Sequence, residues 1–203
     1  MPALSELYEE IKLCRQCEIA HQRTRAVPGE GAEDADIMFI GEAPGWHEDQ
    51  QGRPFVGSAG KFLDELLASI NLDRKQVHIA NVIKCRPEGN RDPLPTEIQN
   101  CRKWLGRQIE LIKPKIIVTL GRFSMAMFFS GQTIGKIHGT AQQRGGIIYY
   151  AMYHPAAALH QQRLRQTIMN DMQKIPALLR QVDSVPEKAQ QAEPVQQLKM
   201  FED

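Results

Sequence analysis

The chain has 203 residues, of which 42% are hydrophobic and 24% are charged, so it can bury a core without disulfide staples. No stretch reaches the roughly 18 apolar residues of a membrane span, and the first residues lack the basic flank and apolar run of a signal peptide. We therefore expect a cytoplasmic monomer without membrane contact. Residues 1–180 hold 23 basic and 19 acidic side chains and residues 181–203 hold two and five, a balance too mild to indicate a nucleic-acid partner.

Hydrophobic periodicity predicts helices that alternate with short buried strands. In chain order the elements are a helix over residues 3–13, a strand over 36–41, a helix over 58–70, a strand over 77–83, a helix over 96–112, a strand over 116–121, a helix over 122–129, a strand over 147–153 and a helix over 163–180. Ser58 and Thr96 are expected to cap their helices. The alternation predicts an α/β protein whose parallel sheet is covered by helices on both faces.

The candidate site lies where the strands end, because ligands of parallel sheets bind at the carboxyl edge. The segments 41–45, 83–95 and 154–159 should therefore meet there. The first of them is a turn of two glycines and a proline, whose exposed backbone N–H groups could grip an anion or a carbonyl. A plain strand-to-helix turn explains the same residues.

Three side chains near this edge suit a planar polar ligand. Asn81 ends the second strand with an amide that both donates and accepts hydrogen bonds. Phe55 lies in a flexible glycine-rich segment that could place its ring over the ligand, and His154 follows the fourth strand. Together they could hold a base flipped out of DNA.

The four cysteines, Cys14, Cys17, Cys85 and Cys101, predict a metal site, a redox pair or unrelated core thiols. Charged neighbours on both sides of Cys85 argue against a core position. Four thiolates suit zinc or an iron–sulfur cluster, and the spacing does not choose between them. A structural role, tying the N-terminal helix to the loop after the second strand, is our expectation.

Six motifs in a fixed order identify a family. They are C-x-x-C near the N-terminus, G-E-A-P-G at 41–45, G-R-P-F-V-G-x-A-G at 52–60, N-V-I-K-C-R-P at 81–87, G-N-R-D-P at 89–93 and H-P-A-A at 154–157. From about residue 13 to residue 180 the chain closely resembles family 4 uracil-DNA glycosylases. The resemblance implies a three-layer α/β/α sandwich with a short, mainly parallel four-stranded sheet.

The resemblance also implies an activity and a cofactor. The activity is hydrolysis of the bond between uracil and deoxyribose in single- or double-stranded DNA, which leaves an abasic site for base excision repair. The cofactor is a [4Fe-4S] cluster held by the four cysteines. The uracil site would comprise Gly41, Glu42, Ala43, Phe55, Asn81 and His154.

The chemistry of uracil release gives these residues roles. His154 would stabilise the negative charge that develops on the uracil O2, and Asn81 would read the O4 and N3–H of the base. Glu48 is the candidate for excluding thymine by its bulk near C5. Related glycosylases place an aspartate in the first motif to orient water, whereas Ala43 stands here, so either Glu42 or another group positions the water, or the bond breaks with little help from a base.

Further residues could hold the DNA. Leu159 could act as a wedge, with Arg163 and Arg165 on phosphates, and Lys84, Arg86 and Arg91 could hold the backbone on the other side. Each of these charges is equally well explained as solvated surface.

The domain boundary is placed at residue 182. Residues 1–182 form the glycosylase domain, and residues 183–203 form a tail whose Gln-, Ala-, Glu- and Pro-rich start is expected to be disordered. The tail ends in a peptide resembling those that dock bacterial sliding clamps, with Gln197, Leu198, Met200 and Phe201 as its anchors. A loose terminus is the alternative.

Two other functions compete with uracil excision. One is a non-catalytic DNA-binding module stapled by zinc or iron–sulfur, against which Asn81, Phe55 and His154 argue. The other is a relative that targets a different base or stays covalently attached to DNA. The attached type carries an inserted basic loop with an extra histidine after the third cysteine, and residues 86–93 contain no such insertion.

Overall fold

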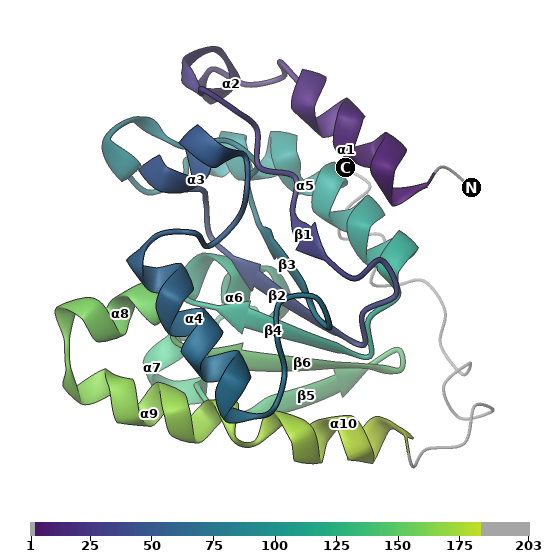
Figure 1. The fold of residues 1–203 in the computed structure, drawn as a ribbon, viewed down its shortest axis with the longest axis vertical. Coiled ribbons are helices and arrows are strands. Elements are labelled where there is room, and N and C mark those ends of the chain that lie inside the picture. Colours follow the sequence, from purple (N-terminus) through teal and green to yellow (C-terminus); the bar gives the residue numbers. More distant parts are fainter. Residues whose placement is uncertain (1–2, 184–203) are drawn as a thin grey trace.

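The computed structural model describes residues 3–183 and contains a six-stranded sheet with helices on both faces (Figure 1). The strands are β1 (Glu30–Gly31), β2 (Ile37–Gly41), β3 (His78–Asn81), β4 (Ile116–Leu120), β5 (Ala141–Arg144) and β6 (Ile147–Met152). Their order is β1-β3-β2-β4-β6-β5. The inner four run parallel, as predicted, whereas β1 and β5 pair antiparallel at the edges.

The expected four-stranded sheet is therefore wrong in its strand number. β1 contains only two residues, and β5 reads Ala-Gln-Gln-Arg, three of its four residues being exposed. Neither has the apolar alternation from which a strand is predicted, and both form because a neighbouring strand offers unpaired backbone groups.

Ten α-helices and one 3-10 turn occur in the described part of the chain. The α-helices are α1 (Leu4–Leu13), α2 (Ile19–Gln22), α3 (Trp46–Gln51), α4 (Ser58–Ser69), α5 (Pro95–Ile112), α6 (Arg122–Phe128), α7 (Ile134–Ile137), α8 (Pro155–His160), α9 (Arg163–Met172) and α10 (Ile175–Asp183). The predicted final helix is divided into α9 and α10, and Pro176, which has no backbone N–H, lies in the first turn of α10.

Both predicted helix caps are displaced. Gly57, not Ser58, precedes the first residue of α4, and as a glycine it has no side chain with which to cap that helix. Leu94 precedes α5, Pro95 occupies its first position, and the Glu97 carboxylate accepts a hydrogen bond from the Leu94 N–H at 2.8 Å. Glu97 therefore performs the capping that was assigned to Thr96.

Alternating side chains of the strands form two cores. In β2, Met38 and Ile40 lie in the core shared with α1, α2, α5 and α6. Ile37 and Phe39 lie in the core shared with α4, α8, α9 and α10. In Figure 1, α4 crosses in front of the strands, and α8, α9 and α10 lie along the left and lower side of the molecule. Helices thus sandwich the sheet, as predicted. No helix within residues 3–183 is long and apolar enough to cross a membrane.

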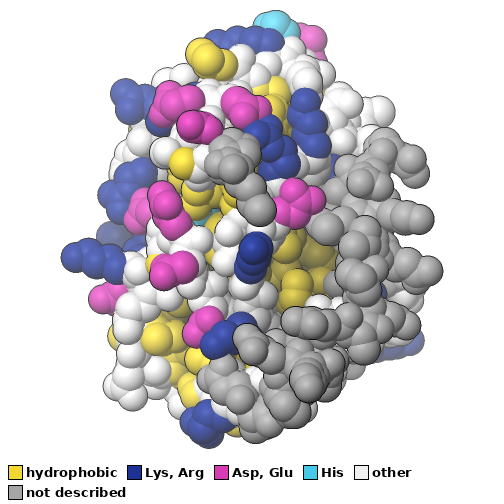
Figure 2. All heavy atoms as spheres, turned by 90° about the vertical axis from the view of Figure 1, so that its right-hand side faces the viewer, with side chains coloured by type: hydrophobic (Ala, Val, Ile, Leu, Met, Phe, Trp, Pro, Cys, Tyr) yellow, Lys and Arg dark blue, Asp and Glu magenta, His cyan; other side chains and the backbone are white. Residues whose placement is uncertain are grey.

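The carboxyl ends of the inner strands meet at one edge, on the side of α3 and α8 in Figure 1. Gly41, the last residue of β2, pairs with Asn81, the last residue of β3. Figure 2 shows the face on the side of the hairpin that joins β5 to β6, where basic and acidic side chains are mixed over the part not covered in grey. The visible part of that face offers no large patch of one charge.

Candidate functional site

A cavity of about 250 Å³ opens at the carboxyl edge of the sheet. It is lined by Glu42, Ala43, Pro44, Gly45, Glu48, Phe55, Ala59, Asn81, Pro87, Asn90, Arg91, His154 and Ala156. The three segments predicted to meet at this edge all contribute, and Gly41 lies directly behind the wall. The prediction that these three segments meet at one edge is confirmed, and the roles of their residues stay predictions.

Asn81 supplies a buried amide with no partner. The residue is 1% exposed, and neither its Oδ1 nor its Nδ2 forms a hydrogen bond within the described residues. A β-carbon on Gly41 would lie 2.4 Å from Asn81 Oδ1 and 2.7 Å from the Phe55 ring. Only glycine at position 41 therefore lets this amide and this ring lie so close together. A buried amide without partners costs free energy, which a ligand in the cavity would recover.

Phe55 is fixed rather than flexible. The residue is 5% exposed, and its backbone has a φ of 51°, a left-handed conformation that is unfavourable for a bulky side chain. Arg74 donates a hydrogen bond to the Phe55 carbonyl at 2.8 Å. The Phe55 ring stacks on the His154 ring with 5.4 Å between centroids and 27° between planes. The expected aromatic platform is present, and the segment carrying it is held in place.

Glu48 connects two walls of the cavity. Its Oε1 accepts hydrogen bonds from the Val56 and Gly57 N–H groups, both at 2.9 Å. Its Oε2 accepts one from the Gly45 N–H at 3.1 Å. This role was not predicted from the sequence. A carboxylate three residues after Gly45, the residue that precedes α3, is a capping signal, so its bond with the Gly45 N–H could have been expected.

Replacing Glu48 by glutamine should lower the free energy of unfolding by about 1–3 kcal/mol. The amide nitrogen of glutamine would face a backbone N–H that now bonds to a carboxylate oxygen, so at least one buried donor loses its acceptor. Urea unfolding at pH 7 measures the change. The exposed Glu110→Gln serves as the matched control, and equal stability of the two variants would contradict the prediction.

His154 is neutral and carries its proton on Nε2. It precedes α8, and the Ala156 N–H donates a hydrogen bond to its Nδ1 at 3.1 Å, so Nδ1 is the unprotonated nitrogen. Burial lowers the pKa of His154 to about 4, although the charge of Glu48 acts in the opposite direction. At neutral pH the ring is therefore an uncharged Nε2–H donor.

Glu42 is the titratable carboxyl group on the same wall. Burial raises its pKa, the negative charge of Asp92 raises it further, and Arg122 opposes both. Ala43 beside it has no polar side chain. Glu42 is thus a carboxyl group with a raised pKa that borders the cavity, and its role in positioning water stays a prediction.

Acid should destabilise the protein through two histidines whose pKa values are lowered, the buried His78 and the partly buried His154. Burial lowers the pKa of His78 to about 4, as it does for His154, from an ordinary value near 6.5. Between pH 6.5 and 4 the unfolded chain binds protons that the folded chain does not, so the free energy of unfolding is highest above pH 6.5 and falls as the pH is lowered.

The variant His78→Gln should reduce the slope of this fall by about 1.4 kcal/mol per pH unit near pH 5. Urea unfolding at several pH values measures the slope, with the exposed His21→Gln as control. An unchanged slope in His78→Gln would show that His78 is protonated in the folded protein.

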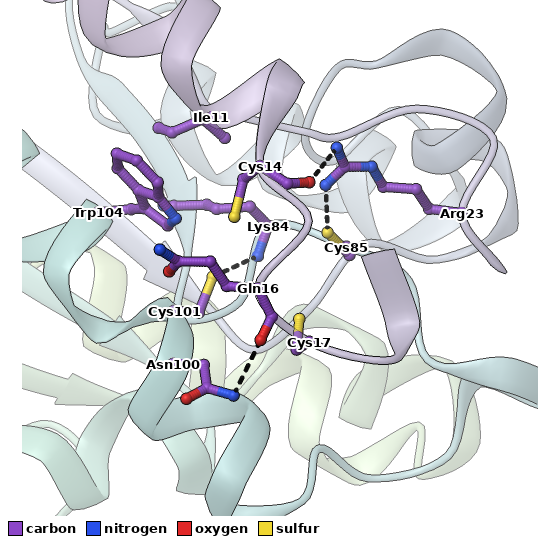
Figure 3. Close-up of a pocket in the computed structure, with 10 residues that line it drawn as sticks. All are labelled: Ile11, Cys14, Gln16, Cys17, Arg23, Lys84, Cys85, Asn100, Cys101 and Trp104. Carbon is purple, nitrogen blue, oxygen red and sulfur yellow. Dashed lines mark hydrogen bonds between the residues drawn. The ribbon is translucent and has the colours of Figure 1, made fainter. Parts of the chain in front are cut away.

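All four cysteines border one small cavity between α1, the end of β3 and α5 (Figure 3). Cys85 and Cys101 are buried, and Cys14 and Cys17 are partly buried. The burial of Cys85 corrects the inference that its charged neighbours keep it out of the core. Among residues 3–183, no three Cys, His, Asp or Glu side chains approach closely enough to hold one metal ion. The predicted gathering of the thiols is confirmed, and a metal is not shown.

Two hydrogen bonds point at the thiol sulfurs. Arg23 Nη1 donates to Cys85 Sγ at 2.8 Å, and Arg23 Nη2 donates to the carbonyl of Cys14 at the same distance. The backbone N–H of Lys84 donates to Cys101 Sγ at 3.2 Å. Figure 3 shows Arg23 bridging the two cysteine loops. Such donors stabilise thiolates, the form in which cysteine binds metals.

The candidate DNA-contact residues differ from one another in their exposure and in their side-chain partners. Lys84 is 1% exposed and cannot reach a phosphate, which corrects that assignment. Leu159 is 50% exposed. Arg91 lines the cavity and pairs with Glu97, and Arg165 pairs with Glu65. The two remaining arginines donate to nearby side chains, Arg86 to Asn90 and Arg163 to Gln161.

The site defines a class of protein: an α/β protein with a cavity at the carboxyl edge of its sheet, lined by an aromatic ring, a buried amide and a histidine. A model of the uracil DNA glycosylase superfamily matches residues 28–178. The chain therefore belongs to this superfamily, in agreement with the motifs.

Named relatives cover most of the chain. A type-4 uracil-DNA glycosylase of Archaeoglobus fulgidus is 44% identical over 88% of this chain and 94% of its own length. A type-4 uracil-DNA glycosylase of Sulfurisphaera tokodaii is 47% identical over 88% of this chain and 86% of its own length. One of Thermotoga maritima is 40% identical over 85% and 92%, respectively.

Proposed function

We propose that this chain removes uracil from DNA by hydrolysing the N-glycosidic bond, which releases free uracil and leaves an abasic site for base excision repair. The observation that carries this function is the unpartnered Asn81 amide, buried beside Phe55 in the cavity. Uracil offers that amide an acceptor at O4 and a donor at N3. Cytosine offers a donor at the first position and an acceptor at the second, so its binding would leave buried polar groups unpaired.

The reaction separates charge, and His154 is placed to stabilise one side of it. As the glycosidic bond breaks, the sugar becomes positive and the departing uracil carries negative charge on N1 and O2. The Nε2–H of the neutral His154 would donate to O2 as that charge develops. Gly41, Glu42 and Ala43 would form the wall beside the base. Glu42 is the group proposed to position water for attack on the sugar carbon.

Glu48 is proposed to exclude thymine. Its carboxylate lines the cavity and is held by three backbone N–H groups, so it cannot swing away from a methyl group on the base. If Glu48 supplies the steric barrier at C5, Glu48→Ala should release thymine from a T-containing oligonucleotide at a measurable rate. A variant that folds and still ignores thymine would remove this assignment.

The four cysteines are proposed to hold a [4Fe-4S] cluster. The donor set fits such a group, since it consists of four thiols from three chain segments around one cavity, with N–H donors aimed at two of the sulfurs. When bound, the cluster would supply a structural cross-link between α1, β3 and α5. Iron analysis and visible absorbance test it: Cys101→Ser should lose both, and zinc without iron in the anaerobically purified wild-type protein would overturn it.

DNA binding is proposed to use Arg86 and Arg91 on one side of the cavity and Arg163 and Arg165 on the other, with Leu159 as the wedge. The substrate strand would run past the opening with its uracil turned into the cavity. Replacing an arginine that contacts a phosphate should reduce the slope of log affinity against log salt by about one. Unchanged slopes in all four Arg→Gln variants would dismiss this path.

A sliding-clamp contact is proposed for Gln197, Leu198, Met200 and Phe201, which lie outside the described residues. Attached through the residues that precede it, this peptide would raise the local concentration of the enzyme at replicating DNA. Undiminished clamp binding after deletion of residues 196–203 would refute the contact.

The function is tested on a labelled oligonucleotide with a single uracil. After incubation with the protein and treatment with hot alkali, strand cleavage should occur at uracil and not at thymine or cytosine in the same position. Protein that is folded and holds iron but leaves the uracil strand intact would favour a DNA-binding module without catalysis.

A further inference from the structure

Lys84 is a buried lysine that the proposed reaction does not use. It lies three residues after the end of β3 and is 1% exposed. Neither of its neighbours along the chain, Ile83 and Cys85, is an acidic residue that could pair with it. Burying an ammonium group is costly unless its donors are satisfied. No carboxylate ion pair of Lys84 occurs within the described residues, so neutral oxygens must satisfy it.

The Lys84 ammonium donates to two oxygens. One is the main-chain carbonyl of Asn81, at 2.8 Å, and the other is Oε1 of Gln108 on α5, at 2.6 Å. Gln108 is itself fully buried, and its Nε2 donates to the Pro28 carbonyl at 2.9 Å. The Lys84 side chain thus connects Asn81, whose amide faces the cavity, to Gln108 in the middle of α5.

The main chain of Lys84 is bound on the other side. Its N–H donates to Cys101 Sγ at 3.2 Å, and its carbonyl accepts a hydrogen bond from the Val27 N–H at 2.8 Å. Figure 3 shows Lys84 among the four cysteines, with its bond to Cys101 marked. Lys84 therefore contacts the cysteine cavity through its backbone and Asn81, the last residue of β3, through its side chain.

We propose that Lys84 is a positioning residue for uracil recognition, which holds Asn81 in register through its main-chain carbonyl and couples that register to the cysteine site. This inference rests on the proposed function and deepens it. The Asn81 amide makes no hydrogen bond to any residue within 3–183, so its orientation toward the cavity depends on its backbone. The hydrogen bond from Lys84 to the Asn81 carbonyl holds that backbone.

The test is a double-mutant cycle between Lys84→Met and Asn81→Leu. Lys84→Met keeps an unbranched apolar side chain, one atom shorter than that of lysine, and removes the donors. It should lower kcat/KM on uracil DNA about tenfold, the size of a lost hydrogen bond from a charged group, and weaken competitive inhibition by free uracil to a similar degree. In the Asn81→Leu background the same substitution should change kcat/KM less than twofold. The exposed Lys136→Met should have no effect in either background.

Equal losses in both backgrounds would overturn the proposal, because they would show a general structural role. Visible absorbance and iron content are measured on every variant, so that loss of the metal group is separated from loss of positioning. If Lys84→Met does not fold, Gln108→Met, which removes one acceptor of the ammonium, takes its place in the cycle with the same expected non-additivity. An inactive wild-type protein would refute the proposed function, whereas additive losses in active proteins would refute only the positioning role.

Discussion

His154→Ala is expected to lower the single-turnover rate of uracil release about 100- to 1,000-fold, the loss typical of removing one donor to a developing oxyanion. The Nε2–H of His154 is neutral at working pH, because burial lowers the pKa of the ring to about 4 and the Ala156 N–H occupies Nδ1. The donor therefore requires no proton uptake before the reaction. Rates measured with enzyme in excess over a uracil-containing oligonucleotide report the chemical step directly.

Glu42→Ala is the matched comparison, because Glu42 lines the same cavity and is also titratable. We expect a smaller loss, since charge stabilisation of the leaving group contributes more than orientation of water when the sugar is already strongly electrophilic. The reverse order of the two rates would make Glu42 the principal catalytic residue.

The factor by which His154→Ala lowers the rate should stay constant from pH 8 down to about pH 5, since the His154 ring is neutral throughout this range.

Asn81→Leu should have opposite effects on activity and on stability. The amide that would read uracil disappears, so kcat/KM on uracil DNA should fall about 100-fold, which corresponds to roughly 2.7 kcal/mol. The free energy of unfolding should rise by about 1–3 kcal/mol, because two buried polar atoms that have no partner in the described part of the chain are replaced by apolar methyl groups.

Urea unfolding and steady-state kinetics on the same preparations measure the pair of effects. Asn170→Leu, on the exposed surface of α9, controls for the side-chain change and should alter neither quantity appreciably. An Asn81→Leu protein that loses stability would mean that the amide has a partner in the folded protein. A protein that keeps full activity would mean that uracil is recognised elsewhere.

The sequence predicted the inner sheet well because its four strands carry continuous apolar residues and are separated by clear helices. The edge strands were missed because their residues are polar or too few to show a period. Asn81 and His154 could be placed together because each lies at or just after the carboxyl end of a parallel strand, and such ends converge whatever the details of the loops. Phe55 lies between α3 and α4 and was placed by its glycine-rich segment instead. The comparisons confirm the family to which the motifs pointed.

Contacts between distant segments were beyond sequence reasoning. Lys84 stands between an apolar residue and Cys85-Arg86 and was assigned to the surface. Its burial depends on Gln108, 24 residues further along the chain, whose side-chain oxygen accepts a hydrogen bond from the Lys84 ammonium. Glu48 was predicted to exclude thymine by its bulk near C5. Its hydrogen bonds with Val56 and Gly57, which follow Phe55, depend on a turn geometry that the local sequence does not encode. Hydrogen bonds of this kind depend on the completed fold.

The separation of the cysteines along the chain has a consequence for biogenesis. Sixty-seven residues lie between Cys17 and Cys85, so the thiols alone would have to close a long loop, at an entropic cost of about 4 kcal/mol. Packing of α1 on α5 closes that loop independently, through Leu7 and Ile11 in the shared core and an ion pair between Glu10 and Arg107. The cysteine cavity can therefore form by packing of the chain alone, so the proposed cluster would be added as the last step of maturation and would not have to nucleate folding.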